Sequence, residues 1–94
     1  MTTLQQIATK IIKEQELIIG PIAWNEAKKV PGLKVIDQGR GEIDLENADP
    51  KKIVDLLVTQ YERLFGKASH EVCRDAVASL IAGLSPAEIP SSLQ

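Results

Sequence analysis

His70 and Cys73 carry the side chains best suited to covalent chemistry, an imidazole and a thiol. They stand three positions apart in a stretch with helical periodicity, so the imidazole could approach the thiol along one helix. A cysteine nucleophile also needs a third group that orients the base. Cys73 lies on an apolar stripe and His70 lies near a helix start, which favours a packed thiol and a surface histidine. A thiol enzyme built on this pair is therefore the alternative and not the main prediction.

Residues 37–42, with the sequence DQGRGE, superficially resemble a phosphate- or cation-binding loop. They lack the glycine spacing and lysine of a P-loop and the order of oxygen ligands in a calcium loop. We interpret them as a hairpin turn. The nearby acidic residues Asp44, Glu46 and Asp49 are interpreted as a solvated edge and a helix cap. The sequence thus predicts no catalytic residue, no cofactor and no metal site.

Trp24 is the single tryptophan of the chain and follows Gly20-Pro21 among polar neighbours. It can fill the core over the hairpin, which is the preferred interpretation, or it can be an exposed anchor, because tryptophan is enriched at interface hot spots. We take Gly20, Pro21 and Trp24 together as the candidate interaction site.

The composition describes a small, slightly acidic chain. Its 94 residues predict one domain over 1–94, with residues 90–94 as a mobile tail. The net charge of −2 argues against nucleic-acid and anionic-membrane binding, because such binders cluster lysine and arginine. A single cysteine fits a reducing cytoplasm. No apolar stretch reaches the ~18 residues of a membrane span, and the N-terminal segment lacks the pattern of a signal peptide.

Four helices are predicted, at residues 3–19, 21–30, 50–65 and 69–83, because apolar residues recur there at steps of three and four. Gly20-Pro21 separates the first two, with Pro21 as the first residue of the second helix. Asp49 and Pro50 form the start of the third.

The end of the third helix is predicted at Gly66, with a positive φ angle that closes the helix. Ser69 is expected to cap the fourth helix. This helix-glycine-helix unit could also be a helix-turn-helix that reads DNA. Two of the five polar residues that its second helix offers, Glu71 and Asp75, would repel phosphate, so this is the second alternative.

A β-hairpin is predicted over residues 33–46, because apolar and polar residues alternate on either side of a glycine-containing loop. A three- or five-residue loop centred on Gly39 pairs Val35 with Ile43 and Leu33 with Leu45, and sets Lys34 opposite Asp44. The fold class is therefore mainly α, a four-helix domain with a central hairpin in the order α-α-β-β-α-α.

Segments 18–23 (IIGPIA) and 64–69 (LFGKAS) both read as an apolar pair, a glycine, any residue and then small or apolar residues opening a helix. Two helix-glycine-helix halves separated by the hairpin would explain this similarity, and so would chance.

The IGPIA segment, with a helix on each side, resembles short helical modules at the ends of bacterial kinases and response regulators. The resemblance covers about twenty residues, and Trp24-Asn25-Glu26 stands where those modules have basic and valine-rich residues. It implies an accessory domain of bacterial signalling and no particular functional residue.

These observations predict a non-enzymatic protein-interaction or regulatory module of a bacterial cytoplasm. A homodimer is expected, because a second copy would cover surplus apolar surface and the hairpin edge.

Overall fold

The computed structural model describes residues 3–46 and 49–93. Its elements follow in the order α1 (Thr3–Ile19), α2 (Ile22–Ala27), β1 (Leu33–Asp37), β2 (Glu42–Leu45), α3 (Pro50–Phe65), α4 (Lys67–Ala76), α5 (Ala78–Ile81), and the 3-10 turns η1 (Pro86–Glu88) and η2 (Ser91–Leu93). The predicted mainly helical fold with one hairpin is confirmed, although the last predicted helix is divided into two.

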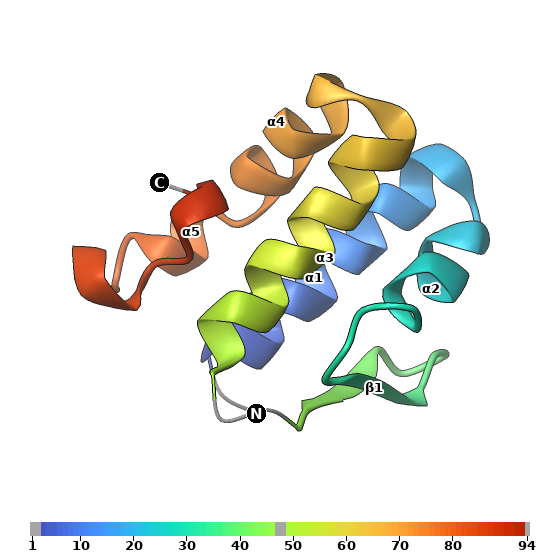
Figure 1. Ribbon diagram of the computed structural model, residues 1–94, viewed down its shortest axis with the longest axis horizontal. Helices are drawn as coiled ribbons and strands as arrows, with labels where there is room; N and C mark the ends of the chain where they lie inside the picture. Colours follow the sequence, from blue (N-terminus) through green and yellow to red (C-terminus); the bar gives the residue numbers. More distant parts are fainter. Residues whose placement is uncertain (1–2, 47–48, 94) are drawn as a thin grey trace.

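The core lies between α1, α3 and α4. Helices α1 and α3 lie side by side and run in the same direction, and the chain returns along α4 (Figure 1). The Tyr61 hydroxyl donates a hydrogen bond of 2.7 Å to the Ala23 carbonyl, which ties α3 to α2. The buried apolar side chains are Ile7, Ala8, Ile11, Ile12, Ala23, Trp24, Ala27, Val30, Leu33, Ile43, Ile53, Val54, Leu57, Val58, Tyr61, Cys73, Val77 and Leu93.

Two glycines end the two long helices. Gly20 follows α1 with φ +79°, and Gly66 follows α3 with φ +87°, so the prediction for Gly66 is confirmed. A positive φ suits glycine because it has no Cβ to collide with the backbone. Helix α2 begins at Ile22, with Pro21 as the residue before it, and ends at Ala27, three residues earlier than residues 21–30 predicted.

The start of α4 differs from the prediction. Gly66 is the N-terminal cap and the helix begins at Lys67, so Ser69 does not cap it. Ser69 is buried instead, and its carbonyl accepts a hydrogen bond of 3.1 Å from the Gln15 side chain. This hydrogen bond joins α4 to α1.

The predicted helix over residues 69–83 is interrupted at Val77, whose φ of −109° and ψ of 6° leave the helical region. The amide of Val77 bonds the Asp75 carbonyl and not the carbonyl four residues earlier. The break allows the Val77 side chain to be fully buried. No glycine or proline marks this position, so burial and not local propensity divides the helix.

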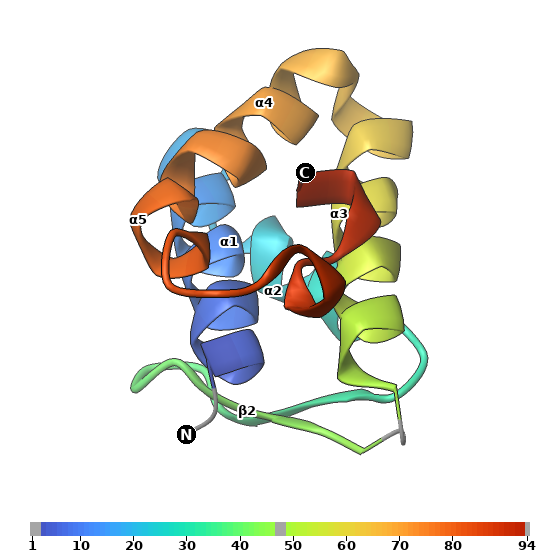
Figure 2. The same ribbon diagram turned by 90° about the vertical axis from the view of Figure 1, so that its left-hand side faces the viewer.

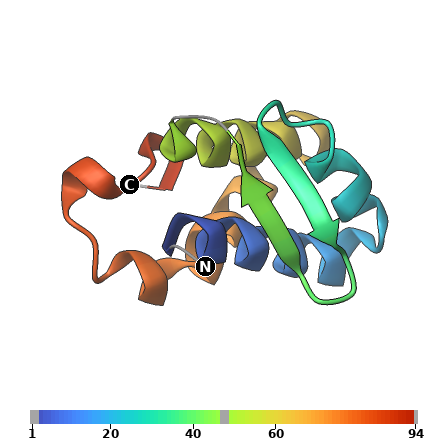
Figure 3. The ribbon, with the colours of Figure 1, turned by 90° about the horizontal axis from the view of Figure 1, so that it is seen from below.

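The hairpin has the predicted register: Leu33 pairs with Leu45, Lys34 with Asp44 and Val35 with Ile43. A bulge between Val35 and Asp37 was not predicted; it places the extra residue, Ile36, outside the pairing and leaves it exposed. Buried Leu33 and Ile43 belong to the same core as the helices. Figure 3 shows the hairpin crossing one side of the helical body.

The chain after α5 forms an extended arm, which we call the C-terminal arm and define as residues 84–93. Figure 2 shows it crossing from α5 towards α3. The Ser85 side chain and the Glu88 carboxylate form a capping box around η1. The prediction of a mobile tail over residues 90–94 is wrong for its described part, because Ser91–Leu93 forms a turn and Leu93 is 1% exposed.

Candidate functional site

Cys73 and His70 do not form a nucleophile pair in this structure. The Cys73 thiol is fully buried and accepts a 3.4 Å hydrogen bond from the Gln15 side-chain amide. Burial raises the pKa of Cys73 to about 11, so the thiolate that a nucleophile needs is disfavoured. The interpretation of this cysteine as core packing agrees with these contacts.

His70 makes its contacts elsewhere. Its Nδ1 lies 2.6 Å from a carboxylate oxygen of Glu62, and its Nε2 contacts the backbone carbonyl of Ser92. The two ring nitrogens therefore contact groups of two different elements, Glu62 on α3 and Ser92 in the C-terminal arm. The residue predicted as a surface histidine therefore links α3, α4 and the C-terminal arm.

The DQGRGE segment is a hairpin turn, as interpreted from the sequence. The Asp37 carboxylate accepts a hydrogen bond of 3.2 Å from the Arg40 amide. The Gly41 carbonyl accepts one of 3.1 Å from the Thr9 hydroxyl, which fastens the turn to α1. These polar groups of the turn therefore make contacts that hold the turn together and fasten it to α1.

Each of the three acidic residues near the hairpin makes a different structural contact. Asp44 accepts a hydrogen bond from Gln5, Glu46 pairs with Lys34 at 3.9 Å, and Asp49 caps α3 through the Lys52 amide at 3.3 Å. Within residues 3–46 and 49–93, His, Cys, Asp and Glu side chains form no group of three or more suited to a metal ion.

Trp24 is part of the core. Its side chain is 1% exposed, and its Nε1 donates a hydrogen bond of 2.9 Å to the Glu16 carboxylate. The exposed-anchor alternative for Trp24 is therefore wrong in this conformation, because α1 and the core occupy the space around the ring. Gly20 and Pro21 remain at the surface or partly exposed, as expected for a turn.

Exposed apolar side chains flank the two glycine breaks. The most exposed are Leu17 at 80%, Ile18 at 62% and Leu64 at 47%, followed by Ile22 at 45% and Phe65 at 39%. Helices α1 and α3 end at the same end of the molecule (Figure 1), and there the Gln15 side chain of α1 donates a hydrogen bond to the Ser69 carbonyl of α4. We call these five residues, with Gly20 and Pro21, the glycine end.

The sequence reasoning did not identify the glycine end as a whole. Ile18, Leu64 and Phe65 fall at the helical spacing from which the helices at residues 3–19 and 50–65 were predicted, which indicates a buried face, and Leu17 does not. The signal that could have identified it is the run of consecutive apolar residues directly before each glycine. Adjacent positions on a helix point in different directions, so these residues cannot all face the core.

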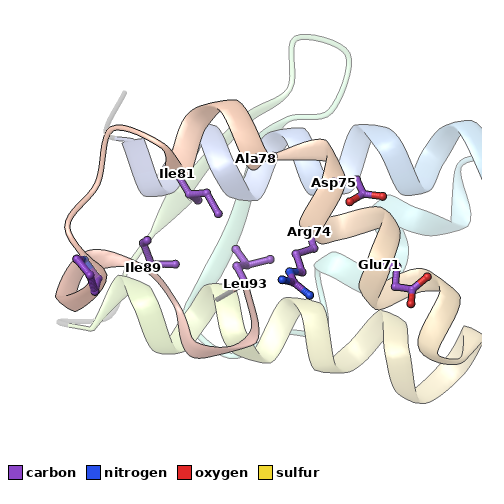
Figure 4. A pocket seen from close by; sticks show the side chains of 8 residues that line it. Glu71, Arg74, Asp75, Ala78, Ile81, Ile89 and Leu93 are labelled. Carbon is purple, nitrogen blue, oxygen red and sulfur yellow. The ribbon is translucent and has the colours of Figure 1, made fainter.

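A groove of about 850 Å³ lies between α4, α5 and the C-terminal arm. Figure 4 shows Ile81, Ile89 and Leu93 gathered at one end, with Glu71, Arg74 and Asp75 on α4 at the other. The charged residues include both signs, which gives no preference for an anion. This groove depends on where the arm is seated.

Across residues 3–46 and 49–93, none of the helices combines the length and the apolar character needed to cross a lipid bilayer. In comparisons with known proteins, no protein-family model, no curated protein and no solved structure matches this chain.

Proposed function

We propose that this protein is a non-enzymatic interaction module that binds a protein partner through the glycine end. The observation that carries the proposal is the exposure of five aliphatic and aromatic side chains on residues close to Gly20 and Gly66, at the end of the molecule where α1 and α3 terminate. Apolar surface next to polar rims is characteristic of protein interfaces, because burying it against a partner removes it from water.

The ends of the helices are suited to this role because they are held rigidly. The Tyr61–Ala23 and Gln15–Ser69 hydrogen bonds fix α2 and α4 against α1 and α3 just behind the exposed residues. A rigid apolar surface loses little conformational entropy on binding, so more of the burial contributes to affinity.

The resemblance of the IGPIA segment supports a role in bacterial signalling, since that segment forms the break between α1 and α2 at the centre of the glycine end. The single cysteine, buried and unpaired, supports action in the reducing cytoplasm. The partner fitted by this surface presents an apolar face, such as one side of an amphipathic helix.

The test compares three baits in a pull-down from a bacterial cytoplasm: the wild type, Ile18→Glu and Ile36→Glu. Ile36 is the matched control, because it is an isoleucine of similar exposure, 59% against 62%, on the hairpin. Once the captured protein is identified, its affinity for each variant is measured by titration. We expect Ile18→Glu to weaken binding by about 30-fold or more, as loss of a hot-spot residue does.

Equal weakening by both substitutions would point to non-specific apolar capture and reject the glycine end. Equal affinity of Ile18→Glu and the wild type would also reject it. Trp24→Ala is not a suitable test, because it would open a cavity in the core and unfold part of the population.

A further inference from the structure

The tip of the C-terminal arm is held by a set of contacts that resembles the recognition of a bound peptide. The Asp55 carboxylate on α3 accepts hydrogen bonds from the Ser92 amide at 2.9 Å, the Ser92 hydroxyl at 2.5 Å and the Ser91 hydroxyl at 3.1 Å. His70 on α4 contacts the Ser92 carbonyl, and Leu93 inserts into the core. We call Asp55, His70 and the apolar recess that Leu93 fills the tip site.

The middle of the arm is exposed, whereas Leu84 before it and Ile89 after it pack against the core. Residues 85–88 are exposed, and so are Ala82 and Gly83 before them. Between the arm and the helical body lie hollows of about 850, 490 and 440 Å³, each lined by residues of both. In this part of the arm, the Lys51 ammonium group of α3 donates a hydrogen bond of 2.6 Å to the Ala87 carbonyl.

An anchored tip on an exposed connection is the geometry of an exchangeable arm. Moving the arm from its own body to another would break the contacts that Leu84, Ala87 and Ile89 make with the first body, and the second body offers the same contacts. The tip would then recover the same hydrogen bonds and the same apolar burial on the other body. Exchange of an identical element between copies is a low-cost route to dimers, because every contact made in one chain can be made between chains.

We propose that the C-terminal arm is exchanged between two copies of this chain, so that Ser91, Ser92 and Leu93 of one copy occupy the tip site of the other. The occupant is a second copy because its arm carries the chemistry that the site already binds: two serine groups for Asp55, a carbonyl for His70 and a leucine for the recess. The proposal does not rest on the glycine end, which lies at a different part of the molecule (Figure 1).

The test is a complementation experiment with two full-length variants. Asp55→Ala with His70→Ala loses both polar groups of the tip site and keeps an intact arm. Leu93→Asp keeps the site and loses a functional arm, because a carboxylate would be buried. Each variant alone should sediment as a 10.3 kDa monomer, and an equimolar mixture at micromolar concentration should contain a species of twice that mass. A mixture that remains monomeric would overturn the proposal.

Circular dichroism of each variant establishes that the helices are retained before mixing. A second measurement needs no variant of the protein: isotope-labelled wild type is titrated with an unlabelled peptide of residues 84–94. We expect the amide signals of the protein's own Ser91 and Ser92 to move to positions typical of unbound chain, as the peptide displaces the arm. The same peptide carrying Leu93→Asp should leave them unchanged. If both peptides act alike, or neither acts, the tip site does not accept an arm from outside the chain.

Discussion

Cys73 illustrates how packing determines the chemistry of a single residue. Its thiol is enclosed by the core and bonded by Gln15, and burial raises its pKa from 9.0 to about 11. At pH 7 the thiol is protonated and shielded, so a thiol reagent must wait for the protein to open. We expect a thiol reagent to label Cys73 more slowly in the native protein than in urea-unfolded protein. The ratio of the two rates measures how much of the native protein is open at any time. Equal rates would revive the thiol-enzyme alternative.

The same thiol predicts a loss of stability at alkaline pH. Because the folded-state pKa lies above the unfolded one, the unfolded chain releases the proton first as pH rises. The contribution of Cys73 is therefore fully present below pH 9 and is lost as pH rises towards 11. Denaturant titrations across that interval should show the free energy of unfolding falling more steeply for the wild type than for Cys73→Ala. Parallel slopes would contradict the prediction.

Gly66 should resist substitution for reasons of backbone conformation alone. Its φ of +87° lies where a side chain is strained, and a Cβ added there meets nothing within 4 Å. Gly66→Ala should therefore lower the free energy of unfolding by about 1–3 kcal/mol. Gly83→Ala is the control, because Gly83 has equally open surroundings and no positive φ. Thermal or chemical denaturation gives both values, and equal stability of the two variants would contradict the strain argument.

At the scale of elements, α1 and α3 agree with the predicted residues 3–19 and 50–65 because their signals are local. Apolar residues at helical spacing, Asp49 as a cap, and glycine after the last turn are visible in the sequence. The hairpin register could be predicted for the same reason, since alternation and loop length fix which residues pair.

The elements that could not be predicted depend on contacts between distant residues. The break at Val77 and the docking of the arm on Asp55 follow from the shape of the core and from hydrogen bonds across 36 to 37 positions. Nothing local distinguishes Ser91 and Ser92 from a mobile polar tail. For the candidate site, the sequence suggested Gly20 and Pro21 as contact residues, which stays a prediction, and it could not decide which of the apolar residues beside them would be exposed.

The hairpin should be sensitive to its fit against α1. A Cβ on Gly41 would lie 2.7 Å from Lys13 Cε and 3.1 Å from Thr9 Cγ2, and the φ of Gly41 is +71°. Gly41→Ala should push the turn away from α1 and weaken the Thr9–Gly41 hydrogen bond, so its destabilisation should be at least the ~1–3 kcal/mol of strain alone. Gly66→Ala is the matched control, because Gly66 also has a positive φ, +87°, but its added Cβ meets nothing within 4 Å. Equal losses of unfolding free energy in the two variants would show that the fit to α1 is unimportant.

The whole molecule presents two separate features for association, the glycine end and the C-terminal arm, at different ends of the view in Figure 1. We therefore expect self-association and partner binding to be separable. The wild type should sediment at twice 10.3 kDa at micromolar concentration through exchanged arms. The Ile18→Glu variant should still sediment at this mass but should no longer bind the partner protein, because Ile18 lies on the glycine end.

Leu93→Asp should show the opposite behaviour in the same measurements: a monomer by sedimentation whose glycine end is intact. A dimer presents two glycine ends, so a partner immobilised at high density should hold the wild type longer than the Leu93→Asp monomer, while a partner free in solution binds both with one affinity. If Ile18→Glu alone converts the wild type to a monomer, the glycine end is itself the dimer interface. The surface proposed for a foreign partner would then be occupied by a second copy of this chain.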